Sequence, residues 1–324
     1  MYFLGVDGGG TKTCAAVADG YGRVLGIGFG GPSNPGWAPE GAVKESVLQA
    51  VKAALGEAGL AAAGIAYSYL GMGGVGDLEH AGPLFEGIMR ELGFRPDAFY
   101  VDNDAYVGMA SAIGIGPGVC LVSGTGFTAV AVTPQGERLR IPRQFLKHGP
   151  GWAIGKEAAM IALLDAWGVG PRTAITERIL SKLGLSDGDE LLDWLGRGAP
   201  NWQLGELAAE VSRCADRSDP VAVELLKATG RELGIAAALM ARKASLDRER
   251  CRIALIGGVF KAGDHVMRPP EEVLRASGVQ AELVRPSAPP VAGALLLACH
   301  RAGKPLSAAQ ADALKEGLAS RLAR

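Results

Sequence analysis

The sequence lacks an excess of either charge and lacks any long apolar run. Its 33 lysines and arginines face 34 aspartates and glutamates, which leaves a formal net charge of -1 over 324 residues. Such a balance provides no positive field for gripping DNA or RNA, so we expect no nucleic-acid partner. The apolar run at 294–299 is far shorter than the ~20 residues that a membrane helix needs, so we expect no membrane contact.

Cysteine is also scarce, and the patterns of secreted or zinc-binding proteins are missing. The five cysteines lie far apart among apolar neighbours, and the four histidines never approach them at a metal-ligand spacing. We therefore expect core cysteines and no structural zinc. The first residues reach Asp7 and a glycine run at once, without the basic start and apolar stretch of a secretory signal, which predicts a cytoplasmic location.

Apolar periodicity and turn signals predict an α/β chain. Short apolar runs alternate with glycine turns over residues 2–28, which is typical of a three-stranded antiparallel meander. After Pro39, apolar residues recur every four positions and mark one face of a helix. Beyond Trp152 the chain is predicted to be mostly helical, including a long helix that begins at Pro220. Further strands are predicted at 65–70, 98–101, 118–122 and 252–256, with helices at 79–92 and 105–113.

The length predicts two lobes, because 324 residues exceed what one hydrophobic core usually serves. We expect a first lobe at 1–113 and a second at 114–324. The segment from Pro305 onward has the pattern of an amphipathic helix, which can pack back on the first lobe.

An internal similarity supports this division. Aligning residues 6–20 (VDGGGTKTCAAVADG) with 122–136 (VSGTGFTAVAVTPQG) without a gap pairs three glycines at a constant offset of 116. The pairs are Gly8 with Gly124, Gly10 with Gly126, and Gly20 with Gly136. We therefore expect a duplicated strand-turn-strand unit, with one phosphate-binding hairpin in each lobe.

The strongest signal for chemistry is DGGGTKT at 7–13. Glycines at a hairpin tip let the backbone approach phosphate oxygens, and Asp7 at the strand end can hold a hydrated Mg²⁺. The alternative is a glycine-rich turn that binds nothing. No GxxxxGK[ST] motif is present, and the segment lies between strands, which excludes a P-loop and a dinucleotide fingerprint. We predict phosphate contacts from Gly8, Gly9, Gly10, Thr11, Lys12 and Thr13.

Two further glycine elements are weaker signals. SGTG at 123–126 is a common kind of turn, but its place in the repeat predicts phosphate contacts from Gly124, Thr125 and Gly126. IGGVF at 256–260 follows an apolar strand, so Gly257 and Gly258 can lie flat against an adenine or ribose. A tight strand-to-helix turn without a ligand explains IGGVF equally well.

Two polar segments are candidates for binding and activating a second substrate. VDNDAYVG at 101–108 places Asp104 at the start of a helix, where its carboxylate can accept a proton from an attacking hydroxyl. Asp102 or Asn103 is expected to cap that helix instead. In GPSNPGW at 31–37, Asn34 can hydrogen-bond a sugar hydroxyl or amide, although the segment alone is only a polar loop.

Taken in order, DGGGTKT, GPSNPG, NDA, SGTG, GPGWAIG, IGGVF and PPVAGALLLA resemble the N-acetylglucosamine and glucosamine kinases and the related BadF/BadG/BcrA/BcrD ATPases. The resemblance covers most of the chain. It implies the two-lobed actin-like ATPase (ribonuclease H-like) fold, an α/β fold with a mixed sheet and flanking helices in each lobe and the nucleotide in the interlobe cleft. Members of the family are often dimers, which by analogy extends to a homodimer here.

The resemblance also implies an activity and roles for residues. ATP, with Mg²⁺, would phosphorylate a hydroxyl of an amino sugar, N-acetylglucosamine or glucosamine. Asp7 and Thr11 would contact Mg-ATP, Asp104 would be the general base, and Asn34 and Gly151 would belong to the sugar pocket.

One departure from the family pattern bears on the substrate. Sugar kinases of the family usually have GDEGS after the glycine-tryptophan segment, whereas this chain has GKEAA at 155–159. Lys156 therefore replaces an acceptor-only side chain with a donor-only one, and a substrate that bears a carboxylate or phosphate would suit it better.

Two alternatives to a sugar kinase differ in what the sequence supports. Family members that activate dehydratases hold an iron-sulphur cluster with cysteines, and this chain has no close cysteine pair. A non-catalytic, regulatory ATP-binding protein is the second alternative. The change to GKEAA favours it, whereas the presence of Asp104 argues against it.

Overall fold

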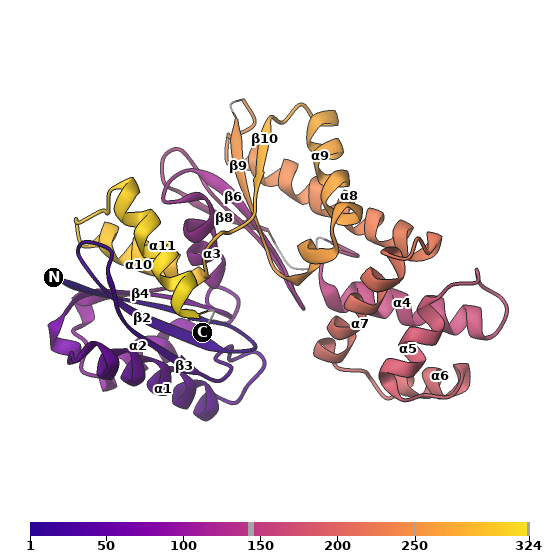
Figure 1. Cartoon of the computed structure of the whole chain (residues 1–324), viewed down its shortest axis with the longest axis horizontal. Helices are drawn as coiled ribbons and strands as arrows, with labels where there is room; N and C mark the ends of the chain where they lie inside the picture. Colours follow the sequence, from indigo (N-terminus) through magenta and orange to yellow (C-terminus); the bar gives the residue numbers. More distant parts are fainter. Residues whose placement is uncertain (142–145, 249, 323–324) are drawn as a thin grey trace. The chain divides into compact units, whose positions relative to one another are not determined.

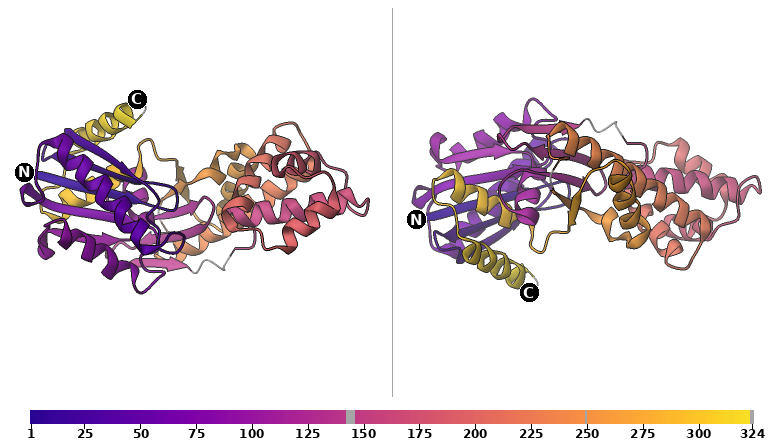
Figure 2. Two further views of the ribbon diagram at one scale, coloured as in Figure 1. Left: turned by 90° about the horizontal axis from the view of Figure 1, so that it is seen from below. Right: turned by 90° about the horizontal axis from the view of Figure 1, so that it is seen from above.

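The computed structural model describes residues 1–141, 146–248 and 250–322, and the chain divides into two compact units. One unit combines residues 1–116 with 284–324, and the other comprises residues 117–283. We expected the second lobe to extend from 114 to 324, but the structure returns the chain to the first unit at Val284. Figures 1 and 2 show this return as yellow C-terminal helices beside indigo N-terminal strands.

The first unit is a five-stranded mixed sheet with helices on both faces. The strand order is β3-β2-β1-β4-β5, and β1 pairs antiparallel with β2 and parallel with β4. Helices α1 and α2 cover one face, and α3 and α10 cover the other. The elements are β1 (Tyr2–Gly8), β2 (Thr13–Asp19), β3 (Val24–Gly30), α1 (Glu40–Ala58), β4 (Ile65–Met72), α2 (Ala81–Glu91), β5 (Phe99–Asp102), α3 (Asp104–Ile113), α10 (Pro290–Arg301) and α11 (Ala308–Leu322).

Burial on both faces explains why β1 and β2 are apolar almost throughout. Successive side chains of a strand point to opposite faces, so neighbours in sequence enter different cores. Leu4 and Val17 pack with α1 and α2, whereas Phe3 and Ala16 pack with α3 and α10. Two helical layers therefore fix the sheet from both sides.

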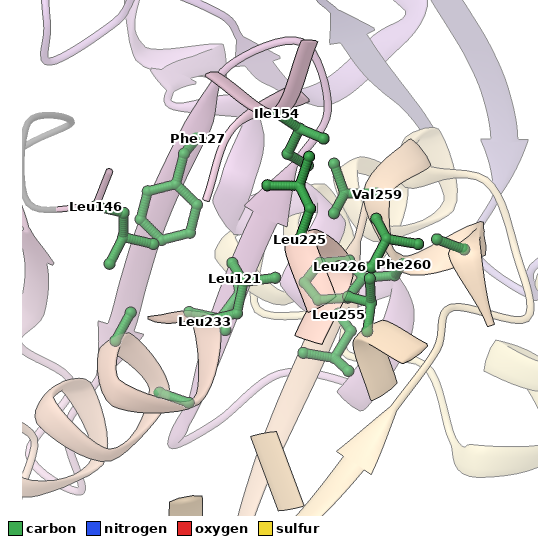
Figure 3. Packing of buried hydrophobic residues seen from close by; sticks show 14 of the residues in the cluster. Leu121, Phe127, Leu146, Ile154, Leu225, Leu226, Leu233, Leu255, Val259 and Phe260 are labelled. Atoms are coloured by element: carbon green, nitrogen blue, oxygen red, sulfur yellow. The ribbon is translucent and has the colours of Figure 1, made fainter. Parts of the chain in front are cut away.

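The second unit has a five-stranded sheet of order β10-β9-β6-β7-β8 and a larger set of helices. Its elements are β6 (Gly118–Ser123), β7 (Phe127–Val132), β8 (Arg138–Ile141), α4 (Gly151–Ala166), α5 (Ile175–Leu183), α6 (Gly188–Gly196), α7 (Asn201–Ala215), α8 (Pro220–Lys243), β9 (Cys251–Ile256), α9 (Asp264–Ala276) and β10 (Ala281–Val284). Strand residues such as Leu121 and Leu255 meet Leu226 and Leu233 of α8 in its core (Figure 3).

The expected duplication is present in the topology, but the alignment without a gap was wrong. Each sheet has an antiparallel three-stranded meander whose first strand pairs in parallel with a later strand. The second turn of each meander makes matching hydrogen bonds from Gly22 to Asp19 and from Gly136 to Thr133, at 3.1 and 2.9 Å. The true offset there is 114, because 136 minus 22 and 133 minus 19 both give 114. Gly136 therefore corresponds to Gly22 and not to Gly20.

The ungapped alignment is wrong because the first turn differs in length between the two meanders. In the first meander, Gly8 pairs with Thr13 across four intervening residues, whereas Ser123 pairs with Phe127 across three. Gly8 thus corresponds to Ser123, the last residue of its strand, and not to Gly124. Glycines are frequent enough in this chain that a shifted alignment still paired them.

The structure confirms the predicted strands, helices and buried cysteines. All the strands and helices proposed above are present, and all five cysteines are buried and free, as expected. The strands β8 and β10 were not predicted, because segments of only four residues give too little periodicity to distinguish a strand from a loop. In the part of the chain that the structure describes, no helix is long and apolar enough to cross a membrane.

The glycines of β3 bring this strand into contact with the backbone of α1. A methyl group on Gly26, Gly28 or Gly30 would lie 2.1, 2.0 or 1.9 Å from the carbonyl oxygen of Ala54, Ala50 or Ser46. The spacing of two along the strand matches the spacing of four along the helix. Helix α1 therefore rests directly on the strand, which requires glycine at these positions.

This contact gives a prediction for a matched pair of glycine substitutions. Gly28→Ala should destabilise the protein by about 1–3 kcal/mol or more, because its methyl group would meet backbone atoms that cannot move aside. Gly56→Ala, within α1, has no atom within 4 Å of the added methyl group and should stabilise by roughly 0.5–1 kcal/mol. Urea unfolding followed by circular dichroism measures both. A Gly28→Ala midpoint equal to wild type would contradict this packing.

Candidate active site

The parallel strands of the first unit gather several polar groups at one edge of the sheet. β1 pairs in parallel with β4, and β4 with β5, so the three strands end on the same side. Asp7 lies near the end of β1, Asp102 ends β5, and Asp104 begins α3 directly afterwards. In open α/β sheets, ligands bind outside the carboxyl ends of the strands. This edge is therefore the natural place for a site.

The first glycine turn is packed on two sides and open in the middle. A methyl group on Gly8 would lie 2.3 Å from Ser33 Oγ, and one on Gly10 would lie 2.3 Å from Trp37 Cε3. At Gly9 nothing lies within 4 Å of the corresponding point. The turn is thus uncovered at Gly9, and the phosphate contact stays a prediction.

The flanking residues of this turn divide into two groups. Thr11 and Lys12 are exposed and can reach a ligand. Thr13 is fully buried, with its hydroxyl 2.8 Å from both Gly31 O and Ser33 Oγ. We predicted a phosphate contact from Thr13, but its buried hydroxyl instead ties the glycine turn to the loop that follows β3.

Asn34 and Asp104 converge on one point although 70 residues separate them in sequence (104 minus 34). A methyl group on Gly73 would lie 2.9 Å from Asn34 Nδ2 and 3.4 Å from Asp104 Oδ2. Gly73 itself donates from its backbone N–H to Gly8 O at 2.7 Å. The amide and the carboxylate therefore meet beside the first glycine turn, over a residue that has no side chain.

Local hydrogen bonds orient both of these groups. The backbone N–H of Gly36 donates to Asn34 Oδ1 at 2.9 Å, which leaves the Asn34 amino group toward Gly73. Asn103 caps α3 by accepting from Ala105 N at 3.0 Å, so the capping role that we expected at 102 or 103 belongs to Asn103. Asp104 then occupies the first helical position of α3, directly after the cap.

Asp7 carries the clearest electrostatic signature of the site. Its pKa is raised from 3.8 to about 7: burial is the largest cause, the negative charge of Asp104 adds to the rise, and Lys12 opposes both effects. Two carboxylates thus share a poorly solvated region with one nearby cation. A divalent metal ion would relieve this conflict, since an adjacent positive charge favours the ionised form.

In the second unit, three of the predicted segments meet. Gly151 N donates to Gly124 O at 2.8 Å, and Trp152 N donates to Thr125 O at 3.1 Å. Gly257 has φ of 113°, and a methyl group on it would lie 2.1 Å from Ser123 O, so only glycine fits there. The SGTG turn is therefore held between the start of α4 and the turn after β9. Gly126 closes that turn by accepting from Gly124 N at 3.0 Å.

Gly258 and Lys156 lie on the accessible surface of this unit. At Gly258 nothing lies within 4 Å of an added methyl group. Lys156 is exposed on α4, and the described residues provide it with no ion pair or hydrogen bond. Both residues therefore have room for a ligand.

Several residues of the first-unit site were not predicted from the sequence. Ser33 and Trp37 pack against the glycine turn, and Gly73 forms the floor under Asn34 and Asp104. The glycine cluster at 70–77 was given no chemical role. Its position directly after an apolar strand was the available signal, because β4 ends there on the same side of the sheet as β1 and β5.

A sequence model of the BadF/BadG/BcrA/BcrD ATPase family matches residues 4–298. The N-acetylmuramic acid/N-acetylglucosamine kinase of Clostridium acetobutylicum is 26% identical over 263 residues, covering 80% of this chain and 85% of the relative. The glucosamine kinase of Vibrio cholerae is 24% identical over 310 residues, covering 94% and 96%. The crystal structure of a proposed N-acetylglucosamine kinase from Chromobacterium violaceum superposes with a TM-score of 0.73 at 30% identity, covering 91% of this chain and 98% of that one.

The electrostatic conflict at Asp7 predicts a pH-dependent effect of Asp7→Asn in the metal-free protein. The folded state binds the Asp7 proton more tightly than the unfolded state, since its pKa is about 7 instead of 3.8. Stability from this group therefore falls as pH rises from about 4 to 7 and stays low above that range. Asp7→Asn removes the penalty, so the melting temperature of the variant should exceed that of wild type at pH 8 but not at pH 4.

Thermal unfolding in EDTA across this pH range measures the effect, for which about 1 kcal/mol corresponds to roughly 2–4 °C. Asp97→Asn is the control, because the Asp97 side chain is 76% exposed. If the difference in melting temperature between Asp7→Asn and wild type does not change with pH, the folded protein does not raise the pKa of Asp7.

Proposed function

Because this chain belongs to the BadF/BadG/BcrA/BcrD ATPase family, we propose that it is an ATP-dependent kinase that phosphorylates a hydroxyl of an amino sugar. The convergence of Asn34 and Asp104 beside the first glycine turn is the observation that carries this proposal. The relatives named above as kinases of N-acetylmuramic acid, N-acetylglucosamine and glucosamine support the substrate class.

The glycine turn is the proposed contact for the donor phosphates of ATP. The turn is uncovered at Gly9, whose own N–H donates to Lys12 O at 3.1 Å. The exposed side chains of Thr11 and Lys12 can supply hydroxyl and ammonium donors to the phosphates. In the second unit, the proposed nucleotide contacts are Gly124, Thr125, Gly126, Gly257 and Gly258, and the tight packing of their two segments supports this assignment.

Asp7 fits a role as the protein ligand of Mg²⁺. No cluster of three or more metal-binding side chains lies within the described ranges, but Mg²⁺ is usually held by one or two carboxylates together with substrate phosphates and water. The raised pKa of Asp7, caused first by burial and then by the charge of Asp104, supports this role, because a bound cation would favour the ionised carboxylate. When bound, Mg²⁺ would neutralise charge on the donor phosphates.

Asp104 is the proposed general base. As the sugar oxygen forms its bond to the γ-phosphorus, the bond from that phosphorus to the β,γ-bridging oxygen breaks, and the hydroxyl proton passes to Asp104 Oδ2. The amino group of Asn34, Nδ2, lies near the same point and can only donate hydrogen bonds. It would therefore orient the acceptor sugar by donating to one of the sugar's oxygens.

A finer proposal concerns the kind of amino sugar. Lys156 is an exposed ammonium group without a partner in the described structure, so it can attract an anionic substituent of the acceptor. N-acetylmuramic acid carries a carboxylate, whereas N-acetylglucosamine and glucosamine do not. The family relative that is named for N-acetylmuramic acid supports an acceptor of this kind.

The cellular setting remains a prediction. We propose a cytoplasmic location, which the five free, buried cysteines and the use of ATP support. A small-molecule sugar is the proposed partner, and a homodimer stays an analogy with the family.

Asp104→Asn tests the proposed chemistry. Turnover should fall by about 10²–10⁴, because the amide cannot accept the hydroxyl proton, while binding of Mg-ATP should persist. ADP release, screened over glucosamine, N-acetylglucosamine, N-acetylmuramate, glucose and a no-sugar control, measures turnover, and calorimetry measures nucleotide binding.

Asp97→Asn serves as the matched control on the surface of the same unit. Turnover of Asp104→Asn near the wild-type rate would exclude Asp104 as the base. ATP binding by wild type without stimulation by any of the sugars would instead favour a regulatory ATP-binding protein.

Lys156→Ala tests the preference for an anionic acceptor. The ratio of kcat/KM for N-acetylmuramate to that for N-acetylglucosamine should fall by roughly tenfold, as expected for loss of one charge-assisted contact of about 1.4 kcal/mol. Lys52→Ala, at an exposed position of α1, should leave the ratio unchanged. An unchanged ratio in Lys156→Ala would remove Lys156 from the acceptor site.

A further inference from the structure

Asp102 is a buried carboxylate to which the proposed reaction assigns no task. Its exposed fraction is only 7%, and it lies two residues before Asp104. A buried carboxylate is costly unless hydrogen bonds satisfy its oxygens. Here the hydroxyl of Tyr69 donates to Asp102 Oδ2, and the backbone N–H of Asn103 donates to Asp102 Oδ1 at 2.9 Å.

The geometry of the two strands explains how Tyr69 reaches this carboxylate. In the parallel pairing of β4 with β5, Tyr69 lies opposite Tyr100, and Gly71 lies opposite Asp102. Residues two apart share a face, so Tyr69, Tyr100 and Asp102 all point toward α3 and α10. Tyr69 is fully buried there, with its ring centroid 5.5 Å from that of Tyr100.

The body of α3 is fixed by contacts that do not involve Asp102. A methyl group on Gly71 would lie 2.3 Å from Val107 Cγ2, and one on Gly293 would lie 1.9 Å from Val107 O, so α3 is wedged between β4 and α10. Farther along, the hydroxyl of Ser111 lies 2.9 Å from Ala288 O. Asp104 lies before these contacts, in the first turn of the helix.

That first turn is held by the junction between β5 and α3. Asn103 caps the helix and also donates from Nδ2 to Val75 O at 2.8 Å, which links the cap to the loop after β4. Asp102 fixes the backbone N–H of Asn103, and Tyr69 fixes Asp102. Both oxygens of Asp102 act as acceptors, a pattern that an amide cannot reproduce without turning one acceptor into a donor.

We propose that Tyr69 and Asp102 are positioning residues for Asp104: the buried hydroxyl-carboxylate pair holds the start of α3 so that the Asp104 carboxylate faces the point it shares with Asn34. This inference rests on the proposed function, since it assigns Asp104 the role of general base. Neither side chain needs to touch a substrate for the pair to act.

Tyr69→Phe is the primary test, because it removes the hydroxyl and keeps the ring. We expect kcat to fall by roughly ten- to a hundredfold, as small misplacements of a reacting group do, with KM for ATP unchanged. Tyr67→Phe is the matched control on the same strand and in the same core, where the described residues offer the hydroxyl of Tyr67 no hydrogen bond. It should keep the wild-type kcat.

A double-mutant cycle separates positioning from a general loss of stability. If Tyr69 acts through Asp104, Tyr69→Phe should cause no further loss of kcat in a protein that already carries Asp104→Asn. An equal loss in both backgrounds, or a kcat of Tyr69→Phe within twofold of wild type, would overturn the proposal. If Tyr69→Phe fails to fold, Asp102→Asn provides the same comparison.

A structural measurement distinguishes failure of this inference from failure of the proposed function. If no sugar stimulates ADP release by the wild-type protein, the kinase assignment fails. Crystal structures of wild type and Tyr69→Phe still test whether Tyr69 positions Asp104. The Asp104 carboxylate of Tyr69→Phe should then lie about 0.5 Å or more from its position in wild type, because functional groups must be held within about that distance of their productive geometry. An unmoved carboxylate would refute the positioning role.

Discussion

Direct contact between helix backbone and sheet is the constraint on which the first unit depends. Gly71 lets α3 rest against β4, Gly293 lets α10 rest against α3, and an added methyl group on Gly5 would lie 2.8 Å from the backbone nitrogen of Leu295 in α10. At Gly5 and Gly293 main-chain atoms meet directly, and at Gly71 the strand meets the β-branched side chain of Val107, so the two helices have little freedom to slide. These contacts hold the body of α3, which carries Asp104 on its first turn.

The site built on this frame is electrostatically unfavourable by itself. Asp7 is half-buried near Asp104, and desolvation, followed by the charge of Asp104, raises the pKa of Asp7 to about 7. Perturbed carboxylates of this kind cluster at functional sites, where a ligand supplies the missing charge. Under the proposed function, the same arrangement that costs stability without a ligand would favour binding of a cation together with phosphates.

The sequence was informative where a local rule applied and failed where tertiary contacts decided. The glycine run, the strand-helix alternation and the cap at Asn103 follow local propensities, so they could be predicted. Thr13 looked like a phosphate ligand from its place in the motif, but the distant Gly31 and Ser33 bury its hydroxyl. Nothing near Tyr69 in the sequence indicates that its hydroxyl meets Asp102, because only the pairing of β4 with β5 brings them together.

The duplicated meanders show how one backbone plan can serve two purposes. With Gly8 matched to Ser123, Asp7 corresponds to Val122, so the second hairpin has no carboxylate at the position that carries the electrostatic conflict in the first. Its Ser123 hydroxyl instead donates to Gly149 O at 2.6 Å and secures the start of α4. Hard divalent cations favour carboxylate ligands, so of these two matched positions only Asp7 fits the proposed metal site. The duplication therefore repeats the glycine turn in both units, whereas the carboxylate proposed to hold Mg²⁺ is present at this position in the first copy alone.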